Sequence, residues 1–142
     1  MDISLDTNIW IFGITGFDPA CEVILAHLDS FSIIVLDQVR TELERNLSSA
    51  EMSRFYHLII KNQATIDFEA VPEELVRAFV QNGLKKGDAV IGAFCEWRGI
   101  NIFVSDNRDF LRGLAPSHSF KVVAPLAFCL TFSLKLQYSN PQ

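Results

Sequence analysis

Short apolar runs rich in β-branched residues alternate along this chain with longer stretches in which apolar residues recur at helical spacing. The short runs predict buried strands at residues 3–6, 32–36, 100–105 and 120–124, and a weaker strand at 64–68. The helical spacing predicts helices at residues 18–30, 37–47, 48–63, 71–83, 86–99, 107–115 and 125–130. Strands that alternate with helices in this way predict an α/β fold with a central, mostly parallel sheet and right-handed crossovers.

The chain gives no sign of a second domain. No repeat, low-complexity tract or flexible linker interrupts residues 1–142, which are therefore expected to form one domain. The 49% hydrophobic content is enough for a packed core. Three scattered cysteines disfavour a disulfide framework and indicate a reducing compartment. An acidic N-terminus and the lack of a bilayer-length apolar run predict a cytoplasmic protein that has no membrane anchor.

Carboxylates stand near the ends of several predicted strands, at the edge where open α/β sheets bind their ligands. Asp6 and Asp106 each follow a strand, and Asp88 lies in the first turn of its helix. Glu42 lies about one turn into the helix that follows the second strand. Because these ends share one edge of the sheet, the four acids are expected to converge, with Asp109 as a fifth.

Each acid also has a simpler explanation. Any of the aspartates could cap a helix or close a turn, and Glu42 could be a solvated helix residue like its neighbour Glu44. The helix that begins near Asp88 is apolar almost all the way round, however, so its first turn should not face open solvent. Asp37 is expected only to cap its helix.

Carboxylates held close together in a partly desolvated site repel one another unless a cation neutralises them. Without the five acids named above, 17 − 5 = 12 acidic residues would balance the 12 Lys and Arg residues of the chain. Oxygen ligands favour Mg²⁺ or Mn²⁺ over Zn²⁺. The three histidines share no ligand spacing, and neither a serine nucleophile elbow nor a glycine-rich phosphate loop occurs. The sequence thus predicts a hard metal ion and no nucleotide cofactor.

Four motifs, in order, resemble those of the PIN-domain ribonucleases, a family that includes toxins of many toxin–antitoxin pairs. They are LDTNIW, VRTELERNL, KKGDAVIGAF and FVSDNRDF, and the trailing FKVVAPLAFCL is similar to the last strand and helix of that family. The resemblance spans residues 3 to about 130 and implies a PIN-like three-layer α/β/α fold. It implies catalytic, metal-binding acids at Asp6, Glu42, Asp88 and Asp106, an auxiliary metal-binding acid at Asp109, and supporting side chains at Asn8 and Ser105.

The activity implied by the resemblance is hydrolysis of RNA phosphodiester bonds by an endoribonuclease whose cofactor is Mg²⁺ or Mn²⁺. One ion and two are equally consistent with the sequence. An antitoxin protein would be a further partner. The alternatives are a non-catalytic PIN-like module that binds RNA or protein, and a metal-dependent phosphatase, which is disfavoured because LDTN lacks a second Asp two positions on. The family and the abundance of aromatic residues predict a homodimer, with an aromatic surface from Trp10, Phe12, Phe17, Phe55, Tyr56 and Phe79.

Overall fold

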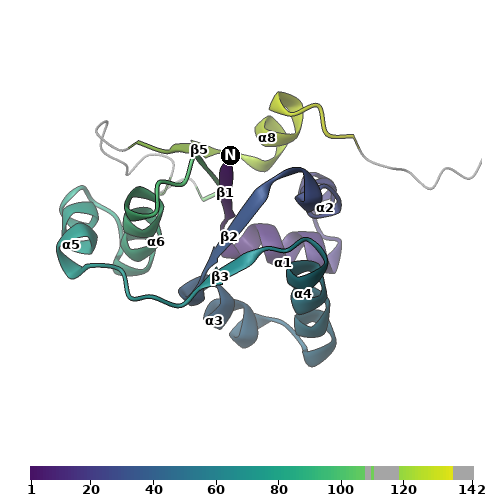
Figure 1. Ribbon diagram of the computed structural model, residues 1–142, viewed down its shortest axis with the longest axis horizontal. Coiled ribbons are helices and arrows are strands. Elements are labelled where there is room, and N and C mark those ends of the chain that lie inside the picture. The colour runs from purple at the N-terminus through teal and green to yellow at the C-terminus, as the bar shows by residue number, and fades with distance from the viewer. Residues whose placement is uncertain (108–109, 111–118, 136–142) are drawn as a thin grey trace, which may run out of the picture.

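The computed structural model describes residues 1–107, 110 and 119–135, and in that part of the chain five strands form one sheet (Figure 1). The spatial order of the strands is β3-β2-β1-β4-β5, and every pair is parallel. The strands are β1 (Asp2–Leu5), β2 (Ser32–Leu36), β3 (Thr65–Asp67), β4 (Ile102–Val104) and β5 (Lys121–Val123). The predicted parallel α/β sheet is confirmed.

Helices cover both faces of this sheet, so the arrangement has three layers. Figure 1 shows α5 and α6 on one side of the strands and α1, α3 and α4 on the other. The helices are α1 (Thr7–Thr15), α2 (Pro19–Ala26), α3 (Asp37–Asn46), α4 (Ser49–Lys61), α5 (Glu73–Gln81), α6 (Lys86–Trp97) and α8 (Pro125–Thr131), with a 3₁₀ turn η1 at Leu28–Ser30. The helix predicted at 107–115 lies largely outside the described residues.

Local capping explains where several helices begin and end. Ser48 and Glu51 form a capping box at the start of α4, in which each side chain accepts a hydrogen bond from the backbone N–H of the other. Helix α1 ends at Gly16, whose φ of 76° is accessible to glycine at little cost. The capping role predicted for Asp37 is wrong: it is the first residue of α3, and its carboxylate pairs with Arg40 Nε at 2.6 Å.

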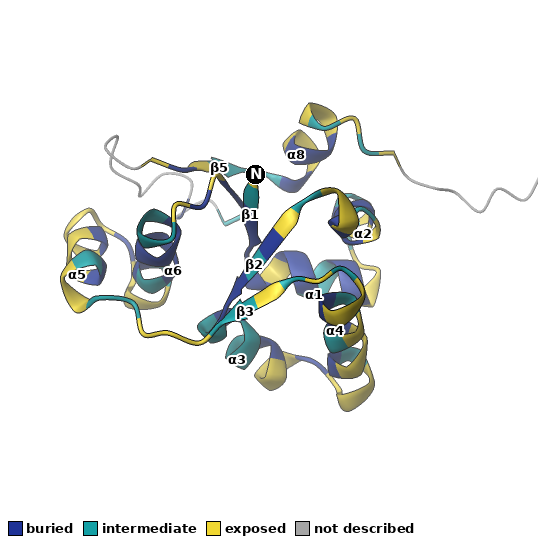
Figure 2. Cartoon of the chain, in the orientation of Figure 1, coloured by how far each residue is buried: buried dark blue, intermediate teal, exposed yellow. Residues whose placement is uncertain are grey.

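The core lies between the sheet and its helices. In-register residues of neighbouring parallel strands point to the same face, so Ile3 packs beside Ile33 and Ile102. Helix α6 is buried over most of its circumference, as its apolar sequence predicted (Figure 2). Its Gly92 permits close packing, because a Cβ at that position would lie 3.0 Å from the Phe79 ring of α5.

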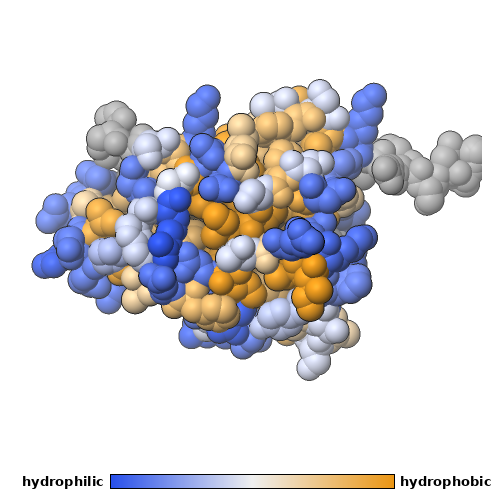
Figure 3. All heavy atoms as spheres, in the orientation of Figure 1, coloured by the Kyte–Doolittle hydropathy of each residue, from blue (hydrophilic) through white to orange (hydrophobic). Residues whose placement is uncertain are grey.

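The surface differs from the expectation of an aromatic face. Trp10, Phe55 and Phe79 are buried, so they cannot form a dimer surface. The exposed large apolar side chains of the described residues are Met1, Phe17, Ile60, Phe68, Val80, Leu126 and Leu130. Figure 3 shows hydrophobic atoms gathered in the middle of one face of the molecule and polar atoms toward its rim. The homodimer stays a prediction, but burial of these aromatic side chains removes one of the two reasons for it.

The three cysteines are free and buried, so none is paired in a disulfide. Among the described residues, no single helix is both long and apolar enough to cross a membrane. In this described part of the chain, one pair of helices, α1 and α2, reaches that length and composition when taken together, and the pair is bent by 95° at its break.

Candidate active site

A cleft of about 370 Å³ opens at the carboxyl-terminal edge of the sheet, where β1 and β4 end and where α1, α3 and α6 begin. This is the edge at which open parallel sheets bind their ligands. Three of the predicted acids line the cleft although they are far apart in the sequence. The polar side chains of its wall include Asp6, Glu42, Asp88, Asn8, Arg45 and Asn107.

Asp6 is held rigidly at the junction of β1 and α1. Its backbone N–H donates to the carbonyl of Val104 at 2.9 Å, which extends the pairing of β1 with β4. Its Oδ1 accepts from the N–H of Thr7 at 2.8 Å, and its Oδ2 accepts from the hydroxyl of Ser105 at 2.7 Å. Asp6 is therefore both the N-cap of α1 and a wall of the cleft.

Burial makes the ionised form of Asp6 costly. The side chain is only 8% exposed, and desolvation raises its pKa from 3.8 to about 6. The hydrogen bonds from Ser105 and Thr7 lower the pKa, whereas the negative charges of Asp88 and Glu42 raise it further. A cation in the cleft would relieve both the desolvation and the repulsion, because it favours the charged carboxylate.

Glu42 enters the cleft from α3 and is tied to two other elements. The Thr7 hydroxyl of α1 donates to its Oε1. Gln38 Nε2 lies 3.4 Å from Glu42 Oε2 and donates to the Gly87 carbonyl of α6 at 3.2 Å, so it bridges two walls of the cleft. The neighbouring Glu44 instead accepts from Arg40 at 2.7 Å and from the Tyr56 hydroxyl at 3.0 Å, outside the cleft.

Asp88 is the third residue of α6, and a carboxylate in the first turn is favoured by the helix dipole. It is partly buried, in agreement with the expectation that this turn does not face open solvent. Its Oδ2 lies 3.4 Å from the side-chain amide nitrogen of Asn107. The end of β4 and the start of α6 therefore meet at this side chain.

The structure corrects the placement of Asp106, which was expected to be the fourth acid. Asp106 is exposed and does not line the cleft, and Asn107 occupies that position. The Ser105 N–H donates to Val123 O at 3.0 Å, so the chain continues past β4 in strand-like pairing. Side chains alternate in such a segment, so Ser105 and Asn107 face the cleft and Asp106 faces away.

Helix α2 lies within reach of the charge of Asp106. The pKa of Cys21 there is raised to about 12, mainly by burial and then by the charges of Asp18 and Asp106. Of the other predicted residues, Asn8 is exposed in the cleft wall and Ser105 is fully buried beneath Asp6. Asp109 lies outside the described residues.

Sequence reasoning missed four side chains of the site. Thr7 and Gln38 position Glu42, and Arg45 and Asn107 line the cleft. Thr7 stands beside Asp6 in the first motif, and Asn107 stands two positions after Ser105, so strand alternation could have identified both. The bridge made by Gln38 depends on how α3 packs against α6, which no local pattern reveals.

Comparison with models of protein families matches residues 3–113 to the PIN domain. This chain belongs to the PIN domain family. Comparison with curated proteins found no match. Solved structures that share this fold include VapBC2 from Rickettsia felis bound to a DNA fragment from their promoter, and PAE2754 from Pyrobaculum aerophilum.

Each of the two matches covers most of this chain and nearly all of the chain that it matches. The Rickettsia felis chain is 19% identical with a TM-score of 0.59, and the match covers 87% of this chain and 98% of that one. The Pyrobaculum aerophilum chain is 14% identical with a TM-score of 0.59, and the match covers 94% of this chain and 96% of that one. At these identities the likeness shows the fold.

The donor set of this PIN domain fits a hard divalent cation. The three carboxylates supply only oxygen ligands for an ion, the chemistry that Mg²⁺ and Mn²⁺ prefer. Burial and the charges of Asp88 and Glu42 raise the pKa of Asp6, and a cation beside it would favour its ionised form. Among the described residues, however, no three His, Cys, Asp or Glu side chains are gathered closely enough to hold an ion as they stand.

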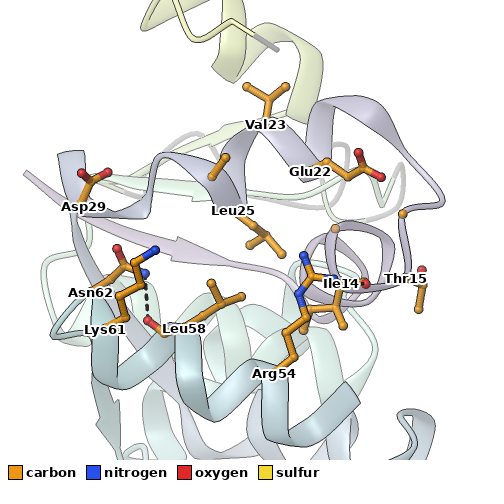
Figure 4. Close-up of a pocket in the computed structure, with 13 residues that line it drawn as sticks. Ile14, Thr15, Glu22, Val23, Leu25, Asp29, Arg54, Leu58, Lys61 and Asn62 are labelled. Atoms are coloured by element: carbon orange, nitrogen blue, oxygen red, sulfur yellow. Dashed lines mark hydrogen bonds between the residues drawn. The ribbon is translucent and has the colours of Figure 1, made fainter. Parts of the chain in front are cut away.

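A larger hollow of about 760 Å³ lies elsewhere on the PIN domain, between α1, α2 and α4 (Figure 4). Arg54 and Lys61 project from α4 on one wall, while Glu22 and Asp29 stand on the opposite wall. Arg54 is engaged by the Ile14 carbonyl, to which its Nη1 donates at 3.2 Å. With its two acids opposed by two cations, this hollow lacks the uncompensated negative charge that distinguishes the acid cleft.

Proposed function

We propose that this protein is an endoribonuclease that hydrolyses RNA phosphodiester bonds with Mg²⁺ or Mn²⁺ at the acid cleft. PIN domains are generally nucleases, which supports a nuclease function for this member. The observation that carries the proposal is the convergence of Asp6, Glu42 and Asp88 from three separate elements, with Asp6 buried at a raised pKa. Groups whose pKa values are perturbed in a cleft are characteristic of functional sites.

The chain's own residues position the donors. Asp6, Glu42 and Asp88 would hold the ion, and the Asn107 amide nitrogen lies against Asp88 Oδ2 and orients it. Ser105 directs Oδ2 of Asp6, and the Thr7 hydroxyl holds Glu42. When bound, a divalent ion supplies a water of lowered pKa and stabilises negative charge on the phosphoryl and leaving oxygens. No protein nucleophile is needed for this chemistry.

Two further parts of the proposal concern partners. One of the structures with this fold is a VapBC2 assembly bound to promoter DNA, and the family includes toxins of toxin–antitoxin pairs. On this basis we assign the chain as the toxin of such a pair, with a cytoplasmic antitoxin protein as its partner. A small neighbouring gene that encodes a DNA-binding protein, and co-purification of its product with this chain, would support that assignment.

The direct test is incubation of the purified protein with a panel of structured and single-stranded RNAs, with Mn²⁺ and with EDTA. Cleavage that requires Mn²⁺ is the expected result, and a single-stranded DNA of the same sequence tests the preference for RNA. Binding of RNA without cleavage would favour the non-catalytic module instead. Hydrolysis of a phosphomonoester without cleavage of any phosphodiester would favour the phosphatase.

A further inference from the structure

The acid cleft contains one cationic side chain among its described lining residues, Arg45 of α3. Arg45 lies three residues after Glu42, so both side chains project from the same face of the helix. Around it, the cleft carries the negative charges of Asp6, Glu42 and Asp88. Without metal, a polyanion would meet net repulsion there, and Arg45 is the place at which it would meet attraction.

Arg45 differs from Arg40 and Arg98 in having no ion-pair partner among the described residues. Arg40 pairs with Asp37 and Glu44, and Arg98 pairs with the last residue of β3, Asp67, and with Glu69 just after it. Arg45 is exposed and makes no ion pair or side-chain hydrogen bond within the described part of the chain. Its guanidinium therefore keeps all five N–H donors for a ligand or for water.

A simpler role for Arg45 is also consistent with its position. It stands in the last turn of α3, where a cation interacts favourably with the helix dipole. That interaction is worth only ~0.3–1 kcal/mol at an exposed position. An arginine in the same turn that faced away from the cleft would make it equally well. It therefore gives no reason for Arg45 to line the cleft beside the acids.

We propose that Arg45 binds a backbone phosphate of the RNA next to the phosphodiester that is cleaved. This inference rests on the proposed function. The planar guanidinium matches two oxygens of a phosphate group and so fixes both position and orientation of the strand. Arg45 is thus a substrate-binding residue on the α3 wall of the cleft, and it offsets part of the repulsion between the acids and the RNA backbone.

The test compares wild type with Arg45→Gln, Arg45→Lys and the control Arg77→Gln, which removes an exposed arginine of α5 outside the cleft. Cleavage of a short fluorescent single-stranded RNA in Mn²⁺ is measured at several KCl concentrations. A charge-assisted contact to phosphate predicts that Arg45→Gln raises KM about 10-fold or more. Loss of one phosphate contact should also make the slope of log(kcat/KM) against log[KCl] about 0.7 less negative.

The conservative variant and the metal response separate binding from a structural role. Arg45→Lys should restore the salt slope while leaving KM above that of wild type, because Lys keeps the charge but loses the planar fork. Mn²⁺ should stabilise Arg45→Gln against heat at least as much as it stabilises wild type. The inference would be overturned, with the proposed function left standing, if Arg45→Gln kept the KM and the salt slope of wild type. The same would follow if Arg77→Gln changed both quantities as much as Arg45→Gln does. Absence of cleavage by wild type would overturn the proposed function and this inference with it.

Discussion

Replacement of Asp6 by Asn should make the metal-free protein more stable at neutral pH, although it removes a cleft acid. The native carboxylate is buried, and at pH 7 it is held ionised against its raised pKa of about 6. Asn keeps the shape of the side chain. It can still accept from the Thr7 N–H, and its amide can donate to the Ser105 hydroxyl oxygen. The substitution therefore removes the buried charge and leaves the cap of α1 in place.

The size and the pH range of the gain follow from the shift in pKa. Because the folded state binds the proton of Asp6 more tightly than the unfolded state does, this group favours folding most strongly below pH 3.8, its ordinary pKa. That stability is lost as the pH rises through about 6. The full loss above pH 6 corresponds to ~3 kcal/mol. Asp6→Asn should thus gain about 2 to 3 kcal/mol relative to wild type at pH 7, and little at pH 4.

Urea unfolding in EDTA between pH 4 and pH 8 measures this difference, and Asp18→Asn is a matched control. Asp18 caps α2 by accepting from the Ala20 N–H at 2.8 Å, but it lies outside the acid cleft. Asn caps a helix about as well as Asp, so the control should change stability by less than ~0.5 kcal/mol at every pH. In millimolar Mn²⁺ the order should reverse, because ligand linkage stabilises wild type and not Asp6→Asn.

Two results would refute this reasoning. The first is that Asp6→Asn is less stable than wild type at pH 7 in EDTA. The interactions of the wild-type Asp6 carboxylate would then stabilise the fold by more than the burial of its charge destabilises it. If the difference between the two proteins did not change between pH 4 and pH 7, the pKa of Asp6 would not be raised.

Three other predictions concern separate parts of the structure. Asn107→Ala should lower the rate of Mn²⁺-dependent cleavage roughly 10-fold or more, whereas Asp106→Asn should stay within about threefold of wild type, as initial rates of variants with matched circular dichroism will show. Gln38→Met should cost ~1 kcal/mol in urea unfolding and weaken stabilisation by Mn²⁺, since it removes the bridge to Glu42; unchanged Mn²⁺ stabilisation would count against this role. Sedimentation at high concentration should show a homodimer, and a lone 16.0 kDa species would contradict it.

Elements with a strong local signal could be predicted from the sequence. The run at 32–36 is β-branched and unbroken, and the structure has β2 at those bounds. Ser48 opens α4 with a capping box, as expected from the capped pattern at 48–63. The start of α3 was assigned less well, because Asp is common both as an N-cap and in the first turn. The sequence does not distinguish these two positions of Asp37.

The cleft was predicted only in part, because the direction of a side chain depends on more than its place in the chain. Asp6 and Asp88 reach the cleft as the strand and helix ends predicted. Asp106 does not, because strand alternation beyond β4 turns its side chain out of the cleft and brings Asn107 inward. Burial of aromatic residues also depends on tertiary packing. Trp10 of α1 packs edge-on against Phe55 of α4, with ring centroids 4.9 Å apart, a contact that neither helix reveals alone.

The central claim is that carboxylates of the acid cleft carry metal-dependent cleavage of RNA, and two glutamates of one helix test it most directly. Glu42 lines the cleft, whereas Glu44 pairs with Arg40 and Tyr56 on another face of α3. The measurement is the rate of RNA cleavage as a function of Mn²⁺ concentration for wild type, Glu42→Gln and Glu44→Gln. Glu42→Gln should lose Mn²⁺-dependent cleavage while remaining folded, and Glu44→Gln should retain it. Equal activity of the two variants, or cleavage that persists in EDTA, would contradict the account.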